Sequence, residues 1–283
     1  MNKFIITSQQ VKGYKYGNRL ELGTNIGNPR PNIKLSKDEY VTADGEIREF
    51  IHKSENRSEN INSLRKTMKR LGRLIEHNFC GDQNELWITL TYAENVRDTK
   101  KVYDDYKLFM RKLRRRYGTM EYISILEPQK RGAWHIHALL KSEEHTNIFI
   151  PNSELSKIWG NGFVNVKKMR QTDNIAAYVT AYLTDLKHDE NDDVTGKDVD
   201  SKKIEKGARL YLYPVGMNFY RCSRGIKKPD EVTASKQEIF EFYNIKNSVY
   251  LPDNYYSYDV ELPDGNIMTY QREFYNLDYW EKE

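Results

Sequence analysis

Two histidines separated by a single residue form the clearest chemical pattern in the chain. His135 and His137 lie in the segment Trp134–Ala138, whose residues are typical of a strand. Side chains at positions i and i+2 of a strand leave the same face about 6–7 Å apart, so two imidazoles there can share one cation. Such pairs also occur as ordinary surface or core histidines, so the pair alone does not decide between the two interpretations.

A carboxylate upstream offers a third ligand. Glu127 ends the preceding predicted strand, and the turn that follows it can bring its side chain opposite the two histidines. Two histidines and one carboxylate leave coordination positions open, which suits a metal ion that takes part in chemistry. Taken alone, Glu127 is more typical of an ordinary hairpin end.

A third group consists of two tyrosines four residues apart. Tyr178 and Tyr182 lie in a predicted helix over residues 173–187, so they share one helix face and are one turn apart. A stripe of Tyr, Val and Leu usually faces a core, and the spacing alone favours that interpretation. A phenol can also act as a nucleophile when a nearby group takes its proton.

The elements that position these residues alternate between strand and helix patterns. In chain order they are a strand over 86–92, a helix over 98–117, strands over 121–126 and 133–140, a helix over 153–159, a strand over 162–167 and the helix over 173–187. This order predicts an α+β fold with a ferredoxin-like antiparallel sheet and helices packed on one face.

The flanking segments carry weaker signals. A hairpin is expected over 39–50, an amphipathic helix over 58–79, a strand within 209–220 and a helix over 235–243. The first 228 residues have a net charge of +12, whereas residues 229–283 have 12 acidic and 4 basic side chains. We therefore expect three segments: an N-terminal extension (1–80), a central domain (81–228) and an acidic, tyrosine-rich tail (229–283).

Composition excludes several classes of protein. The chain has 283 residues, of which 30% are charged, and no apolar run approaches the length of a membrane helix. Its N-terminus does not resemble a signal peptide, and its two cysteines, Cys80 and Cys222, form no CxxC pair. These features predict a cytoplasmic protein with no membrane partner and no disulfide framework.

The three motifs in this order resemble those of HUH endonucleases that initiate rolling-circle replication. The matching residues are the strand Trp87–Tyr92, then Glu127 with His135 and His137, then Tyr178 with Tyr182. A further segment, Tyr220–Pro229, is similar to one in initiators of low-GC Gram-positive plasmids, phages and integrative elements. The resemblance covers about residues 86–229.

The resemblance implies a mechanism. Glu127, His135 and His137 would bind a divalent metal ion, Mn²⁺ or Mg²⁺, that polarises a scissile phosphate. Tyr178 or Tyr182 would attack the phosphorus and form a 5′-phosphotyrosine link. The partner would be single-stranded or extruded origin DNA, and a host helicase would open the duplex, because the chain has no G-x-x-x-x-G-K motif. The oligomeric state is not indicated.

Several cations and aromatic residues are expected to contact the DNA. Trp134, Tyr211 and Tyr213 are candidates for base stacking. The candidates for contacts with the DNA are Arg131, Lys167, Lys168, Arg170, Lys187 and Arg224.

The sequence departs from the family at one point. Initiators with this tyrosine pair commonly have a lysine three residues after a tyrosine, whereas here those positions are Ala181 and Asp185. Lys187 is the nearest replacement. The departure leaves open a non-catalytic DNA-binding protein descended from an initiator. A conjugative relaxase is a second alternative, although relaxases usually place the tyrosine before a cluster of three histidines.

Overall fold

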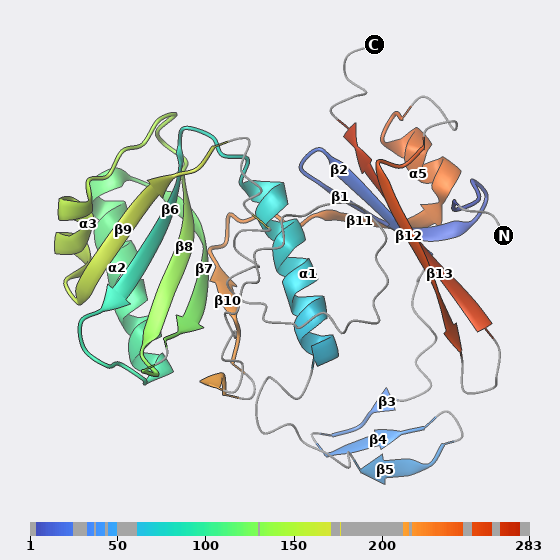
Figure 1. Ribbon diagram of the computed structural model, residues 1–283, viewed down its shortest axis with the longest axis horizontal. Coiled ribbons are helices and arrows are strands. Elements are labelled where there is room, and N and C mark those ends of the chain that lie inside the picture. The colour runs from blue at the N-terminus through green and yellow to red at the C-terminus, as the bar shows by residue number, and fades with distance from the viewer. Residues whose placement is uncertain are drawn as a thin grey trace. The chain divides into compact units, whose positions relative to one another are not determined.

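The chain is described by a computed structural model and divides into two compact units. One combines Met1–Lys53 with Lys228–Glu283, and the other is Ser54–Lys227 (Figure 1). The described residues are 4–24, 33–36, 38–42, 45–49, 61–129, 131–170, 176, 212–214, 217–245, 251–261 and 267–277. Within them, no helix combines the length and the hydropathy that crossing a membrane requires.

The Ser54–Lys227 unit contains an antiparallel sheet with strand order β10-β7-β8-β6-β9. Its strands are β6 (Glu85–Tyr92), β7 (Met120–Pro128), β8 (Trp134–Ser142), β9 (Gly162–Lys168) and β10 (Tyr220–Cys222). β8 lies between β6 and β7, the two strands that helix α2 connects, which is the split arrangement of ferredoxin-like folds. The predicted α+β class is confirmed, and the open sheet with its helices is compatible with an HUH core.

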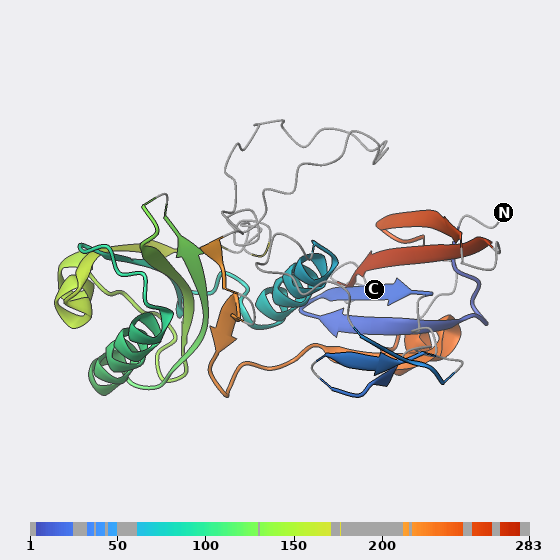
Figure 2. The same cartoon turned by 90° about the horizontal axis from the view of Figure 1, so that it is seen from below.

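Helices α2 (Thr99–Tyr117) and α3 (Asn152–Trp159) cover one face of this sheet (Figures 1 and 2). Asp98 caps α2 by accepting a hydrogen bond from the backbone N–H of Lys100, and Gly118 ends it with a φ of 78°. The apolar side chains that were expected to face the core are buried: Val102, Tyr106, Phe109, Met110 and Leu113.

Helix α1 (Ile61–Asn78) packs on the opposite face of the same sheet (Figure 2). Met68, Leu71 and Ile75 are buried in a core that also contains β6, β7 and β8 residues. The Lys141 ammonium of β8 donates to the backbone carbonyl of Asn78 over 3.1 Å and fixes the end of the helix. A helix predicted within an N-terminal extension is thus part of the core of the second unit.

Strands from both ends of the chain build the sheet of the other unit. Its order is β11-β1-β2-β13-β12, and all its pairs are antiparallel. The elements are β1 (Gln10–Tyr16), β2 (Arg19–Gly23), β11 (Asp230–Ser235), α5 (Lys236–Phe242), β12 (Asn254–Glu261) and β13 (Ile267–Asn276). Ser235 and Glu238 form a capping box at the start of α5, where a helix was predicted. The acidic segment after residue 229 therefore includes three strands of a folded sheet.

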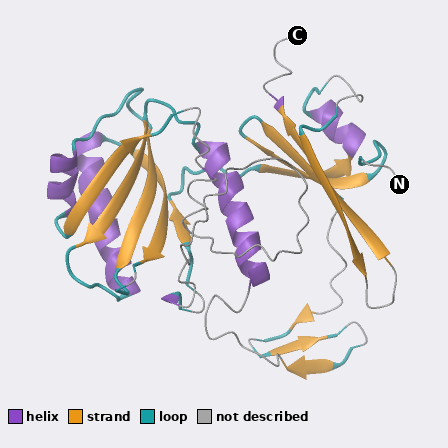
Figure 3. Ribbon diagram, viewed as in Figure 1, coloured by secondary structure: helices purple, strands orange, loops and turns teal. Residues whose placement is uncertain are grey.

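A small third sheet contains the predicted N-terminal hairpin. It consists of β3 (Ile33–Lys34), β4 (Glu39–Val41) and β5 (Ile47–Glu49), and Val41 pairs with Ile47 (Figure 3). Of the strand expected within 209–220, residues 209–211, 215 and 216 lie outside the described residues, and β10 begins at Tyr220. The predicted helix over 173–187 also lies outside the described residues, apart from Ala176. Cys80 and Cys222 are both free thiols.

Candidate metal centre

The register of the sheet places Glu127, His135 and His137 on one face. Glu127 of β7 pairs directly with His135 of β8, and His137 follows two residues later on the same side. Residues whose side chains point the other way, such as Ile136, pair with Leu90 and Leu126 in the core under α2. The predicted turn between the two strands therefore brings all three side chains together.

The three side chains converge closely enough to bind one ion. One ligand atom from each lies within 4.8 Å of the others. The Glu127 carboxylate is 2.8 Å from Nε2 of His137, and the two imidazole centroids are 6.1 Å apart. His137 is buried, whereas Glu127 and His135 are half-buried. The group is therefore accessible from one side and held by the sheet from the other.

The donor set fits a divalent cation. Two ligands at right angles around a cation, each about 2.1 Å from it, lie about 3 Å apart. The 2.8 Å separation between Glu127 and His137 is close to this value. Two nitrogen donors and one oxygen donor suit Mn²⁺ by softness and are also compatible with Mg²⁺. The group can thus bind a divalent metal ion.

Two residues of β6 hold the His137 ring. Oγ1 of Thr89 lies 3.2 Å from Nδ1 of His137, and the Trp87 indole stacks on the imidazole with centroids 5.4 Å apart and planes at 21°. If Nε2 of His137 bound a metal ion, Nδ1 would carry the proton and would donate a hydrogen bond to the Thr89 hydroxyl. The sequence indicates this strand only as a structural motif. Its alternating pattern places Trp87 and Thr89 on one face, but only the register shows that this face is the one of the histidines.

A chain of hydrogen bonds from the β7–β8 turn holds His135. The amide nitrogen of Gln129 contacts Nε2 of His135, and its Oε1 accepts from Nε of Arg131 over 2.7 Å. The Arg131 guanidinium also donates to the Tyr92 carbonyl over 2.7 Å. Arg131 was predicted to contact DNA. Its bonds link the turn to β6 and hold Gln129 beside His135, and its contact with DNA stays a prediction.

An exposed aromatic side chain flanks the site. Phe163 of β9 pairs with Thr91 of β6, which pairs with His135 of β8, so these three residues form one row across the sheet. Two strand spacings separate the Cα atoms of Phe163 and His135 by about 10 Å. Phe163 is 72% exposed. Sequence reasoning missed this residue, although the alternation of residues 162–167 placed it on one face of a strand.

The predicted DNA-contacting cations fall into different environments. Lys167 is exposed and points to the site face, because it pairs with Trp87. Lys168 points to the opposite face, and its ammonium donates to the Ile148 carbonyl and to Asn147, both over 2.9 Å. Burial lowers the pKa of Lys168. Arg170 and Arg224 are exposed. Of the two β9 lysines, Lys167 is therefore the one available on the site face.

Two aromatic residues expected to stack on bases are part of the core instead. Trp134 and Tyr213 are 3% and 1% exposed, and their ring centroids are 5.4 Å apart. The indole N–H of Trp134 donates to the Arg97 carbonyl, and the Tyr213 hydroxyl donates to the Leu126 carbonyl. Each ring thus packs in the interior while its polar atom is satisfied by the backbone. Tyr211, Tyr178, Tyr182 and Lys187 lie outside the described residues.

Comparison with known proteins supports the family resemblance. Residues 85–187 match the family model described as Replication-associated protein ORF2. The matched segment starts with β6, includes the three metal-site residues and continues through both predicted tyrosines. Searches of curated proteins and of solved structures return no match. The match confirms the resemblance of this segment to rolling-circle replication initiators of the HUH superfamily.

Proposed function

We propose that this chain, which carries a replication-associated domain, nicks origin DNA and transfers the cut strand to start rolling-circle replication. The observation that carries the proposal is the convergence of Glu127, His135 and His137 on one sheet face within the segment that matches the family. The match of residues 85–187 to a replication-associated family supports DNA binding, and a site with open coordination positions suits phosphodiester chemistry.

Glu127, His135 and His137 would hold the divalent cation, Mn²⁺ or Mg²⁺. When bound, the ion would supply Lewis-acid polarisation of the scissile phosphate and hold it for in-line attack. Thr89 and Trp87 would fix the plane of the His137 ring, and Gln129 would fix that of His135. The ligands are thus held in position before DNA arrives.

The nucleophile would be Tyr178 or Tyr182. The phenol oxygen would form a bond to phosphorus while the bond from phosphorus to the 3′-oxygen breaks, and the phenol proton would leave to solvent or to the departing oxygen. The products would be a 5′-phosphotyrosine and a free 3′-hydroxyl. Because one phosphoester replaces another, the reverse reaction can rejoin strands without ATP. Two tyrosines would allow an opening cut and a closing transfer at one site.

The substrate would be single-stranded or extruded DNA. A metal-bound phosphate and a phenol must approach the same phosphorus, which a closed duplex hinders. Phe163 is positioned on the site face to stack on an unpaired base, and Lys167 lies further along the same face of β9 to contact the backbone. A host helicase would then unwind the template.

A covalent-adduct assay tests the proposal. The full chain is incubated with Mn²⁺ and a pool of 3′-labelled single-stranded oligonucleotides with random central sequences. The label should then migrate with the protein on a denaturing gel. The adduct should disappear with EDTA and with His137→Ala, and it should persist with His145→Ala, which removes an exposed histidine outside the site. An adduct that forms equally well in EDTA would contradict the metal-dependent mechanism.

The same assay tests the two tyrosines. Tyr178→Phe and Tyr182→Phe should each retain the adduct, and only the double variant should lose it. Loss with one single variant would identify that residue as the sole nucleophile. DNA binding without any adduct, at every metal concentration tested, would instead favour a non-catalytic descendant of an initiator, for which the missing lysines at Ala181 and Asp185 are the supporting observation.

A further inference from the structure

The outward face of α2 is strongly basic. Its exposed ionisable residues include a single acid, Asp104. The exposed bases are Lys100, Lys101, Lys107, Arg111, Lys112, Arg115 and Arg116. The helix of 19 residues is about 28 Å long, so these charges are spread along a rigid rod, over about half of its circumference. We refer to these seven side chains as the α2 basic stripe.

Most of this charge is not neutralised within the protein. Lys101 pairs with Asp105, and Arg116 pairs with Glu154 of α3. Lys107, Arg111, Lys112 and Arg115 make no ion pair with any residue in the part of the chain that the structure describes. Lys107, Arg111 and Arg115 follow at four-residue steps of about 6 Å and lie on one side of the helix. Such a row is costly in self-repulsion unless an anion lies along it.

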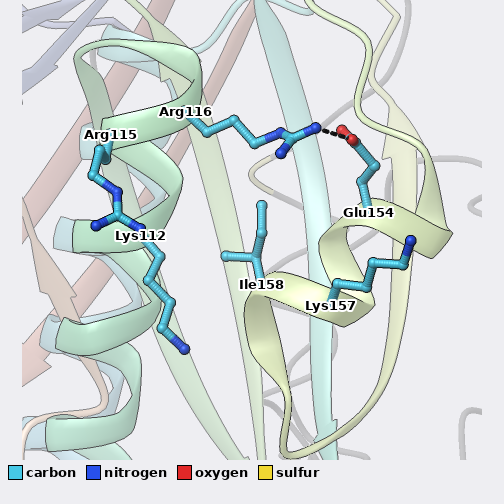
Figure 4. Close-up of a pocket in the computed structure, with 6 residues that line it drawn as sticks. All are labelled: Lys112, Arg115, Arg116, Glu154, Lys157 and Ile158. Atoms are coloured by element: carbon cyan, nitrogen blue, oxygen red, sulfur yellow. Dashed lines mark hydrogen bonds and ion pairs between the residues drawn. The ribbon is translucent and has the colours of Figure 1, made fainter.

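A hollow beside the stripe adds a second cationic element. It lies between α2 and α3, has a volume of about 490 Å³, and is lined by Lys112, Arg115, Arg116, Glu154, Lys157 and Ile158 (Figure 4). Four of these six side chains are basic, and the single carboxylate already pairs with Arg116. The hollow therefore extends the positive surface from α2 to Lys157 of α3.

The chemistry of this surface fits a regular polyanion rather than unpaired bases. Binding of a single strand relies on aromatic side chains that stack on bases. On α2, the guanidinium of Arg221 lies 3.3 Å from the centre of the Tyr103 ring and covers it, and the Tyr117 hydroxyl is bound to Glu154. Cations without a stacking surface contact phosphates alone, as proteins do along a duplex backbone.

The stripe and the metal centre lie on opposite faces of the sheet. The side chains of β6 that pack under α2, such as Leu90, alternate with Thr89 and Thr91, which face the histidines. A strand held at the metal centre therefore cannot also lie along α2 at the same position. Each face requires its own length of DNA.

We propose that the α2 basic stripe, together with Lys157, binds the phosphate backbone of duplex DNA at a site separate from the metal centre. The inference rests on the proposed function for the choice of DNA over other polyanions. A protein that holds duplex on one face and a single strand on the other is suited to the junction where an extruded strand leaves its duplex.

The test compares salt dependence of duplex binding. The full chain with Lys107→Gln, Arg111→Gln, Lys112→Gln and Arg115→Gln is titrated against a labelled 40-base-pair duplex between 50 and 300 mM NaCl. Each phosphate contact contributes about 0.9 to the slope of log K against log salt. Removal of four contacts should lower the slope by about 3 to 4 and weaken binding at 100 mM salt at least tenfold.

A charge-matched control removes four cations from the other unit, as Lys15→Gln, Arg19→Gln, Lys34→Gln and Arg48→Gln. The slope of log K against log salt for this variant should differ from that of the unaltered chain by no more than about 0.9, the contribution of one phosphate contact. An unchanged slope in the α2 variant, or an equal loss in both variants, would overturn the proposal. Lys107→Arg with Lys112→Arg should retain binding, which separates loss of charge from misfolding.

The adduct assay separates this inference from the proposed function. The α2 variant is the chain with the four Gln substitutions in the stripe. At saturating concentrations of a short single-stranded oligonucleotide, it should form as much covalent adduct as the unaltered chain, because the stripe is not part of the metal centre. A reduced slope without any adduct in either protein would support the duplex surface and contradict the nicking function. Normal adduct formation with an unchanged slope would support the nicking function and contradict the duplex surface.

Discussion

Each unit of the molecule has an antiparallel sheet that buries ionisable side chains, but the two groups are built differently. In the first unit, Lys236 and Glu273 are 2.8 Å apart, and their side chains are 6% and 1% exposed. The Glu273 carboxylate also accepts from the Ile5 N–H and from the Tyr275 hydroxyl, both over 2.7 Å. The Lys236 ammonium also donates to the Ile5 carbonyl. This group is a closed, charge-balanced network.

The group in the second unit combines two imidazoles with one carboxylate. Glu127 and His137 are 2.8 Å apart, yet the Glu127 side chain is 21% exposed, and no ammonium or guanidinium pairs with this carboxylate among the described residues. A cation would complete its charge balance. Burial of ionisable groups therefore does not identify a functional site. What distinguishes the metal centre is the set of convergent ligand atoms that an external cation can satisfy.

Removal of one charge from the closed network should destabilise the protein most strongly. Lys236→Met should lower the free energy of unfolding by about 3–5 kcal/mol, because it leaves the buried Glu273 carboxylate without its cation. Denaturant unfolding followed by circular dichroism measures the change. Lys236→Met combined with Glu273→Leu should recover part of the loss, because neither charge then remains buried. A single variant as stable as the unaltered chain would show that the pair is not a stabilising element.

The next effect concerns the orientation of a metal ligand. Thr89→Val keeps the shape of the side chain but removes the hydroxyl that lies 3.2 Å from Nδ1 of His137. Outer partners of this kind typically contribute 10- to 100-fold in metal affinity, so Mn²⁺ binding should weaken by about that factor. Thr89→Ser, which keeps a hydroxyl, should bind nearly normally. If Thr89→Val bound Mn²⁺ as tightly as Thr89→Ser, the Thr89 hydroxyl would have no role in metal binding.

The smallest effect concerns the approach of the substrate. Phe163→Ala should weaken binding of a 20-nucleotide single strand by at least about fivefold, since stacking on one base contributes about 1–3 kcal/mol. Fluorescence anisotropy measures the change, and Phe163→Trp should preserve the affinity. Duplex affinity should not change, because a duplex offers no unpaired base. A parallel loss for duplex would indicate that the substitution disturbs β9 itself.

Local patterns allowed prediction of the site-bearing part of the fold. The period of α2 and the alternation of β7 and β8 placed Val102 in the core and His135 beside His137. The short turn between β7 and β8 left Glu127 few alternatives to a position across from His135. These features depend on residues close in sequence, where periodicity and turn length restrict the possible structures.

Features that depend on distant contacts could not be predicted from local patterns. The pairing of β2 with β13 joins residues about 250 positions apart, and no local signal indicates that a tyrosine-rich acidic segment forms strands beside an N-terminal hairpin. Trp134 and Tyr213 were expected at a DNA surface because aromatic residues serve both stacking and core packing. Their environment depends on which segments cover them, and sequence periodicity does not report that.

Calorimetric titration of Mn²⁺ into the metal-free chain measures whether Glu127, His135 and His137 form one divalent metal site. We predict one bound ion per chain for the unaltered protein and for His145→Ala. His137→Ala and Glu127→Gln should lose the binding while keeping the circular dichroism spectrum of the folded protein. Binding of Mn²⁺ with unchanged affinity and stoichiometry in both variants would show that these residues do not form the metal site.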